Sequence, residues 1–323
     1  MRLVSLRSGT DTHAGLLLGE RVLDLSEAEK ERADWSGLPR SVRGILAGGD
    51  AVSSRIAAIA SDIEKDAELA NRLVRSGALA PTDPSRLTAP IPDPGLMLTV
   101  GMNYHDHLRE MGSVAPTAPY SFTKNIAAIV GPTDTIRLPP DSPDMVDWEA
   151  ELVVVIGKTC HQASEAEATA CIGGYMIAND VSARNWSAAV RQQTGIMGPI
   201  YAWEMNLLGK QFPTFCPLGP ALVTPDELDD PANLAITTRI NGEVMQSSNT
   251  REMIFSPAFL ISHYSRFYRF QPGDIILTGT PAGVGAGRNP KRFLKRGEVV
   301  EITIEQIGTI RNPVELGRNN SGS

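Results

Sequence analysis

The fold of this chain is decided by the stretch Asp147-Trp148-Glu149-Ala150-Glu151-Leu152-Val153-Val154-Val155-Ile156-Gly157. Its continuous apolar run predicts a strand that is buried on both faces. Because side chains alternate along a strand, Glu149 and Glu151 project on the same side, about 7 Å apart. A hard divalent cation held by carboxylate oxygens would relieve the repulsion between two such charges. A solvated acidic edge strand is the commoner source of Glu-x-Glu, but the apolar run favours a functional pair.

The overall composition restricts the class of protein. The chain has 323 residues, a formal net charge of -7 and 42% hydrophobic residues, which predicts one large domain with a smaller appendage. The acidic balance argues against a nucleic-acid partner, because phosphate binding requires a basic surface. No apolar run is long enough to span a membrane, and residues 1–6 do not resemble a signal peptide. Three cysteines without a recognisable pattern fit reduced thiols, so we expect a cytoplasmic protein with no membrane partner.

A proline-rich segment divides the chain. Five prolines lie within residues 81–95, which predicts an extended linker there. Before it, residues 1–80 predict a small N-terminal α+β domain, with strands over 2–6 and 15–25 and a helical period over 51–77. After it, residues 96–313 predict the main domain, and residues 314–323 a disordered tail.

The main domain is predicted to be rich in strands. Many strand candidates and few helical segments follow the linker, with no regular strand–helix alternation, so a doubly wound parallel sheet is disfavoured. The sequence thus predicts an α+β fold that is mainly β. The strand candidates are Met97–Val100, Ala127–Val130, Glu151–Ile156, Gly174–Ala178, Leu234–Ile240, Ile275–Thr278 and Val299–Ile304, and the helical candidates are Ser164–Cys171 and Ser256–Tyr268.

Further polar residues could complete a site around the glutamate pair. Asp180 directly follows a predicted strand and is the best third carboxylate, although an Asp there could also cap a turn or helix. His107 and Glu110 have the i, i+3 spacing that places them on one face of a helix, where the carboxylate can orient the imidazole as a base. A solvated polar start of a helix explains that spacing nearly as well.

Two other features suggest contacts with an anionic substrate. The glycine-rich run from Thr278 to Gly287 has neither the P-loop nor the dinucleotide-binding pattern, yet its backbone amides could hold an anion. A plain tight loop is the simpler explanation of that run. Lys124 and Lys210 could supply positive charge, although most lysines are simply surface charges.

Taken in order, these segments resemble the fumarylacetoacetate hydrolase family. The resemblance extends from about Leu87 to Asn312, and residues 1–80 resemble, more loosely, an N-terminal domain that many members carry. The matching segments are Gly101-Met102-Asn103-Tyr104, His107 with Glu110, Phe122-Thr123-Lys124, Asp147–Leu152, Gly174-Tyr175, Asn179–Arg184, Gly209–Phe212, Cys216–Pro220, Asn241-Gly242-Glu243, Pro272-Gly273-Asp274 and Thr278–Pro281.

The resemblance implies a mixed β-sandwich roll assembled as a homodimer. It implies one Mg²⁺ or Mn²⁺ per subunit, and a Met111–Tyr120 segment that acts as a lid over a small 2-oxo or diketo acid. The implied metal ligands are Glu149, Glu151 and Asp180, the implied catalytic residues are His107, Glu110 and Lys210, and the implied substrate-binding residues are Tyr104, Lys124, Arg184, Gly279 and Thr280. One departure concerns specificity, because Ser187 stands where many members have a glutamine that contacts substrate.

The implied activity is hydrolysis of a carbon–carbon bond in a β-diketo acid of the acylpyruvate or fumarylpyruvate type. The reaction would pass through an enolate held at the metal, with His107 and Glu110 activating water. An alternative on the same scaffold is a 2-oxo acid decarboxylase or isomerase of the oxaloacetate or hydroxyheptadienedioate type, which has less need of an activated water. A non-catalytic binding protein would be favoured by loss of the His–Glu pair or of Lys210, and both are present.

Overall fold

The computed structural model describes residues 1–9, 11–185, 195 and 197–318. Its centre is a mixed sheet of 12 strands in the order β4-β3-β2-β1-β14-β12-β11-β17-β6-β7, with β5 added to β1 and β8 added to β14. These strands are β1 (Arg2–Ser8), β2 (Asp11–Leu18), β3 (Arg21–Asp24), β4 (Leu79–Pro81), β5 (Leu87–Thr88), β6 (Met97–Gly101), β7 (Tyr120–Thr123), β8 (Ile129–Val130), β11 (Ala150–Ile156), β12 (Ile172–Asn179), β14 (Cys216–Val223) and β17 (Ile275–Leu277).

Two smaller sheets accompany the large one. The first has five strands in the order β16 (Glu243–Asn249), β15 (Ala235–Ile240), β18 (Val299–Ile304), β19 (Gly308–Leu316) and β9 (Ile136–Leu138). The second is a short pair formed by β10 (Val146–Asp147) and β13 (Ser182–Ala183). The described helices are α1 (Leu25–Ala28), α2 (Val42–Ala47), α3 (Gly49–Lys65), α4 (Ala67–Ser76), α5 (His105–Glu110), α6 (Glu165–Ala170), α8 (Met197–Leu208) and α9 (Pro257–Ser265), besides short 3₁₀ turns.

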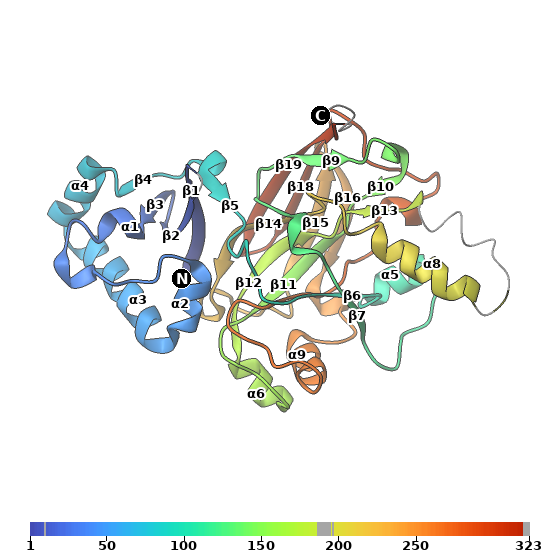
Figure 1. Ribbon diagram of the computed structural model, residues 1–323, viewed down its shortest axis with the longest axis horizontal. Coiled ribbons are helices and arrows are strands. Elements are labelled where there is room, and N and C mark those ends of the chain that lie inside the picture. The colour runs from blue at the N-terminus through green and yellow to red at the C-terminus, as the bar shows by residue number, and fades with distance from the viewer. Residues whose placement is uncertain (10, 186–194, 196, 319–323) are drawn as a thin grey trace, which may run out of the picture.

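The strand from the opening stretch is the middle of the fold. All seven residues of β11 are buried, because β12 and β17 pair with its two edges and other elements cover its faces. The five-stranded sheet packs near it, as Figure 1 shows, and most of the buried apolar side chains form one large core, with a second small cluster around Val4 and Leu6 of β1. The prediction of an α+β fold that is mainly β, of the mixed roll type, is confirmed.

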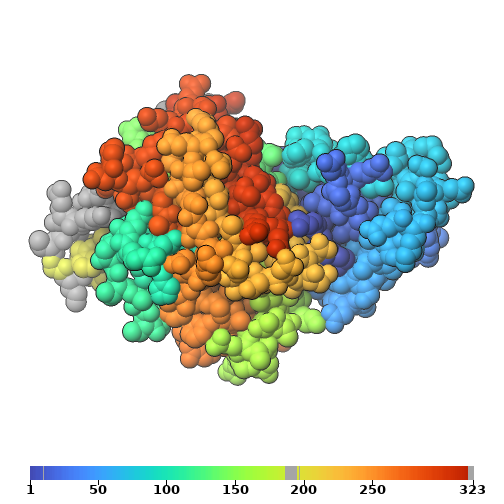
Figure 2. Space-filling model, turned by 180° about the vertical axis from the view of Figure 1, so that it is seen from behind, coloured from blue at the N-terminus to red at the C-terminus, as the bar shows by residue number. Residues whose placement is uncertain are grey.

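The N-terminal residues are built from the same sheet as the rest of the chain. Helices α1–α4 surround β1–β4 at one end of the molecule, and Figure 2 shows this part as a lobe beside the larger body. However, Leu3 of β1 pairs with Leu222 of β14, so the large sheet runs through both parts. In the proline-rich segment, Leu87 pairs with Leu6, and Ile91 is fully buried. The division into a domain at 1–80, a linker at 81–95 and a domain at 96–313 therefore stays a prediction.

Several predicted boundaries differ from the structure. The expected helix over 51–77 is two helices, because Asp66 is extended and its carboxylate caps α4 through the amides of Glu68 and Leu69. The expected strand over 15–25 is a hairpin that turns at Gly19, whose φ is +61°.

Two further predictions need correction near the sheet edges. The strand expected over 127–130 is reduced to β8, because residues 126–128 form a 3₁₀ turn. The tail expected from residue 314 starts too early, since Val314 is buried and pairs with Ile136 as β19 continues to Leu316.

Candidate active site

Three buried carboxylates meet where β11 and β12 lie side by side. Glu149 and Glu151 flank Ala150, which pairs with Asn179, the residue before Asp180. The amide of Asp180 donates to the carbonyl of Glu149 over 2.9 Å, which fixes the two chain segments together. Each of the three residues offers a carboxylate oxygen that lies within 4.8 Å of the other two. Antiparallel register thus unites a glutamate pair with an aspartate that is distant in sequence.

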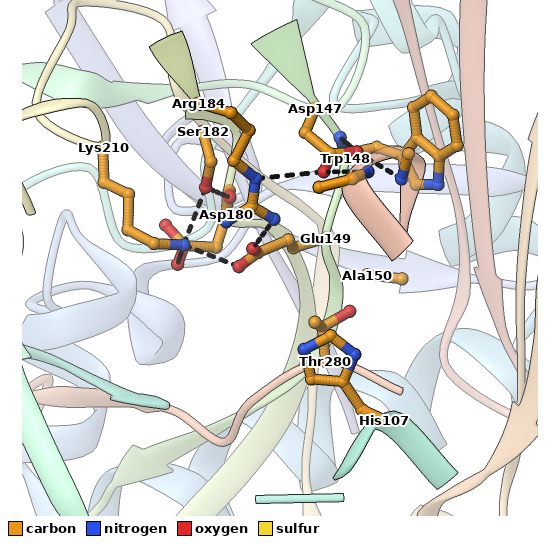
Figure 3. Close-up of polar contacts among 12 residues, drawn as sticks. His107, Asp147, Trp148, Glu149, Ala150, Asp180, Ser182, Arg184, Lys210 and Thr280 are labelled. Atoms are coloured by element: carbon orange, nitrogen blue, oxygen red, sulfur yellow. Dashed lines mark hydrogen bonds and ion pairs between the residues drawn. The ribbon is translucent and has the colours of Figure 1, made fainter. Parts of the chain in front are cut away.

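Lys210 connects two of these carboxylates, as Figure 3 shows. Its Nζ atom donates to Glu149 Oε2 over 2.6 Å, to Asp180 Oδ2 over 2.7 Å and to Ser182 Oγ over 2.7 Å. Burial opposes the charged form of Lys210, but the negative charges of Asp180 and Glu149 outweigh it and raise the pKa of the ammonium. Lys210 is therefore a permanent cation inside the site.

Arg184 and Asp147 extend this network toward the glycine-rich run. Arg184 donates through Nη2 to Glu149 and through Nε to Asp147 Oδ2, the latter over 3.0 Å. Asp147 also accepts the amides of Gly285 at 2.6 Å and Ala286 at 3.0 Å. Asp147 thereby joins the guanidinium in the site to the loop that follows β17.

The charges around Glu149 and Glu151 are unequal. Burial disfavours ionisation of Glu149, yet Lys210 and Arg184 outweigh this effect and lower its pKa to about 2. Glu151 has a pKa raised well above its ordinary value by burial and by the negative charges of Asp180 and Glu149. Its side chain accepts a hydrogen bond from the amide of Gly279, at 2.7 Å.

This imbalance fits a divalent cation. Negative charge is in excess among the described residues of the site. Four carboxylates, those of Asp147, Glu149, Glu151 and Asp180, face three cations, which are Lys124, Arg184 and Lys210. No cation pairs with Glu151 in the described parts of the chain, and its carboxylate lies within reach of the two other candidate ligands. Hard oxygen donors in this number are the ligands that Mg²⁺ and Mn²⁺ prefer.

His107 and Glu110 form the pair expected from their spacing on α5. The His107 Nδ1 and Glu110 Oε2 atoms are 3.0 Å apart, and Glu110 Oε1 accepts the amide of Gly283 at 2.9 Å. Because a carboxylate is an acceptor only, this hydrogen bond assigns the proton to Nδ1 and leaves Nε2 as the basic nitrogen. Both partners are held by backbone structure, so the imidazole has a defined orientation.

A cavity of about 460 Å³ contains these groups. That volume lies within the range of about 300–1,000 Å³ found for small-molecule sites. The lining residues come from the 12-stranded sheet, from α5 and α8 and from the loops between these elements, including the loop after β17; they include His107, Phe122, Met145, Glu149, Glu151, Asp180, Arg184, Trp203, Lys210, Thr280, Val284, Lys291 and Phe293. His107 and the carboxylates thus share one cavity.

The structure brings only some of the expected substrate-binding residues to this cavity. Arg184 and Thr280 line it, and Thr280 Oγ1 accepts a hydrogen bond from Gln246 Nε2 at 2.9 Å. Tyr104 is not among the residues that line it, and its ring is fully buried. Gly279 is not among them either, although its amide donates to Glu151, which does line the cavity.

Lys124 is bonded to one of the three carboxylates. Its Nζ atom donates to Asp180 Oδ1 over 2.6 Å and to the carbonyl of Lys210 over 2.5 Å, and it is not part of the cavity wall. The Lys124 side chain is buried, so its positive charge stabilises the ionised carboxylate of Asp180. The contact of Lys124 with substrate stays a prediction, and the contacts that the structure shows are those with Asp180 and with the carbonyl of Lys210.

Two other predicted features are the specificity position and the lid segment. Ser187 lies outside the described residues. The segment Met111–Tyr120, expected to be a lid, has no regular structure before β7, and Met111 and Tyr120 line the cavity.

Sequence reasoning missed several residues of the site. Asp147 opens the decisive stretch and could have been suspected because it precedes a buried acidic strand. Ser182 follows Asp180 by two residues, which was a weaker signal. Trp203 and Lys291 had no local signal, because only the packing of α8 and of a distant loop brings them to the cavity.

The fold and this site define a family of enzymes. The chain belongs to the fumarylacetoacetate hydrolase family, since the family model "Fumarylacetoacetate (FAA) hydrolase C-terminal" matches residues 97–315. It is 51% identical over 226 residues to the protein named "Oxaloacetate tautomerase FAHD2A, mitochondrial" from Bos taurus, covering 70% of this chain and 68% of the relative. The sequence resemblance to this family is thereby confirmed.

Solved structures agree over nearly the whole chain. A putative HpcE protein from Mycobacterium smegmatis matches with a TM-score of 0.76 and 33% identity, covering 98% of this chain and all of that one. The maleylpyruvate hydrolase from Sphingobium sp. SYK-6, solved in complex with manganese(II) ion and pyruvate, matches with a TM-score of 0.69 and 26% identity over 98% and 100% of the two chains. The chain is therefore an enzyme of this family, and its acidic cluster fits a divalent metal.

Proposed function

We propose that this enzyme catalyses metal-assisted proton transfer at the carbon next to the keto group of a small 2-oxo acid, interconverting its keto and enol forms. The observation that carries the proposal is that one cavity holds an oriented imidazole and a cluster of three carboxylates. Support comes from the bovine relative, whose name specifies oxaloacetate tautomerisation. A divalent ion bound by Glu149, Glu151 and Asp180 would supply Lewis-acid polarisation of the keto group.

The residues of the chain would carry the proton. His107 Nε2 would accept the proton from the carbon, while Glu110 stabilises the positive imidazole that results. Lys210 would place its fixed positive charge near the oxygen on which negative charge develops. Returning the proton from His107 to that oxygen completes the tautomerisation. No water is consumed and no leaving group is released.

A second candidate is hydrolysis of a carbon–carbon bond in a β-diketo acid. It is favoured by the Nε2 of His107, which has no hydrogen-bond partner among the described residues, and by a cavity lined by His107 that is large enough for a water beside the substrate. The resemblance to the maleylpyruvate hydrolase also supports it. In that reaction, His107 would take its proton from water instead of from carbon.

The choice of Mg²⁺ or Mn²⁺, a homodimer and a cytoplasmic location remain predictions. No described helix is both long and apolar enough to cross a membrane. The bovine relative is named as mitochondrial.

The decisive experiment compares two reactions on metal-free and metal-loaded protein. We expect chelator-treated protein to lose its acceleration of the decay of enol-oxaloacetate, followed by ultraviolet absorbance, and to recover it with Mg²⁺ or Mn²⁺. Cleavage of acylpyruvates should be measured in parallel. Faster cleavage of acylpyruvates than tautomerisation would favour the second candidate, and full activity without metal would contradict both.

A further inference from the structure

Lys291 is set apart from the other cations that line the cavity. Arg184 and Lys210 are both bonded to buried carboxylates, so their charges are already compensated within the site. Lys291 is exposed, and in the part of the chain that the structure describes its ammonium has no hydrogen-bond or ion-pair partner. It therefore offers a charge at the cavity that no described residue compensates.

The backbone on both sides of Lys291 is held in place. Before it, the amides of Gly285 and Ala286 donate to Asp147. After it, Arg292 pairs with Glu298 and lies over the ring of Trp148 at 5.9 Å, and the amide of Leu294 donates to Val146 over 2.8 Å. A lysine on an anchored loop can meet a ligand with less loss of entropy than one on a free loop.

The wall of the cavity near the loop favours one class of ligand. Apolar side chains, among them Val284 and Phe293, line it together with Lys291. A substrate whose 2-oxo acid group lies at the carboxylate cluster would extend along this wall. The complement of an unpaired ammonium is a second carboxylate at the far end of that substrate.

We propose that Lys291 binds the distal carboxylate of the substrate, and that the enzyme therefore acts on 2-oxo dicarboxylic acids in preference to 2-oxo monocarboxylic acids. This inference rests on the proposed function for the position of the 2-oxo acid group. It names Lys291 as a specificity residue with no part in the proton transfer.

Binding of unreactive analogues tests the subsite without relying on turnover. Malate and 2-hydroxybutyrate have the same 2-hydroxy acid group, and only malate has a second carboxylate. Dissociation constants for both should be measured by calorimetry on the Mg²⁺-loaded protein. The variants are Lys291→Met, Lys291→Arg, and Lys295→Met as a matched control, since Lys295 is an exposed lysine outside the cavity wall.

We expect the wild type to bind malate more tightly than 2-hydroxybutyrate. Lys291→Met should weaken malate binding about 5- to 30-fold, between the values for exposed ion pairs and for charged hydrogen bonds, without affecting 2-hydroxybutyrate. Lys291→Arg and Lys295→Met should retain the preference for malate. The proposal is overturned if Lys291→Met leaves malate binding unchanged, if it weakens both probes equally, or if the wild type does not prefer malate.

Turnover separates this inference from the proposed function. With oxaloacetate, Lys291→Met should raise KM by the same factor and leave kcat unchanged, because Lys291 does not touch the reacting carbon. Selective malate binding without turnover of any 2-oxo acid would refute the proposed function and retain the subsite. Turnover of oxaloacetate with an unchanged KM in Lys291→Met would retain the function and refute the subsite.

Discussion

The buried wall of the cavity and its exposed rim use charged residues in opposite ways. At the buried wall, Arg184 and Lys210 are bonded to carboxylates whose positions follow from the pairing of β11 and β12. At the rim, Lys291 has no partner among the described residues, and Trp203 is 43% exposed.

The buried wall and the exposed rim are therefore expected to have different roles, one in the reaction and the other in substrate specificity. Removing one partner from a buried ion pair leaves an uncompensated charge, so changes at the wall affect stability as well as catalysis. Exposed side chains at the rim support little of the fold, so they can vary at small cost. We expect the wall to determine which reaction occurs and the rim to determine which acid enters.

The strongest test of the wall is Glu151→Gln. The variant loses a carboxylate that the metal would need, so bound Mn²⁺ and kcat should both fall, kcat by roughly a thousandfold. Its metal-free form should unfold in urea no earlier than the wild type, because the pKa of Glu151 shows that its charge is unfavourable there. Metal content and kcat equal to those of Glu165→Gln, an exposed control on α6, would contradict this role.

The next effect is expected from the base. His107→Asn should lower kcat about 10²- to 10⁴-fold because proton transfer loses its acceptor, while metal binding is retained. Glu110→Gln should also lower kcat, but by less. The glutamine has the same shape as the glutamate, but it lacks the negative charge that stabilises the protonated imidazole of His107. Equal kcat values for His107→Asn and the wild type in single-turnover measurements would rule out the proposed base.

Lys124→Met tests whether the wall is also a structural element. Its removal leaves Asp180 with one fewer cation, and we expect the free energy of unfolding to fall by about 3–5 kcal/mol. Urea denaturation followed by tryptophan fluorescence measures this change. Lys158→Met is the control, because Lys158 pairs with Asp50 at the surface, where the loss should be at most about 1 kcal/mol. Equal losses of unfolding free energy in Lys124→Met and Lys158→Met would contradict a structural role of the buried wall.

The smallest effect is expected at the rim. Trp203 meets Tyr120 edge to face, with ring centroids 5.2 Å apart. Trp203→Leu should therefore lower the free energy of unfolding by no more than about 1.5 kcal/mol and change KM more than kcat. Trp203→Phe keeps a ring and should lie closer to the wild type. A kcat loss as large as that of His107→Asn would show that the rim takes part in the chemistry.

Local patterns in the sequence predicted those parts of the site that depend on neighbouring residues. The alternation of a strand placed Glu149 and Glu151 together, and the period of a helix placed His107 beside Glu110. Asp180 could be suspected at the end of a strand, but its distance from Glu149 depends on the register of β12 against β11. The family resemblance supplied the remaining residues. Lys124, Tyr104 and Gly279 are not among the residues that line the cavity, because motif membership does not specify how each residue packs, and their contacts with substrate stay predictions.

The sequence by itself therefore determined the class of fold, the family and the composition of the acidic cluster, since these depend on periodicity and on motifs in order. Only the tertiary structure decided that β1 joins the large sheet, that Lys124 supports Asp180 and that Lys291 reaches the cavity. The physical reason is that these arrangements come from strand pairing and loop packing between residues far apart in the chain, for which a single sequence contains no local signal.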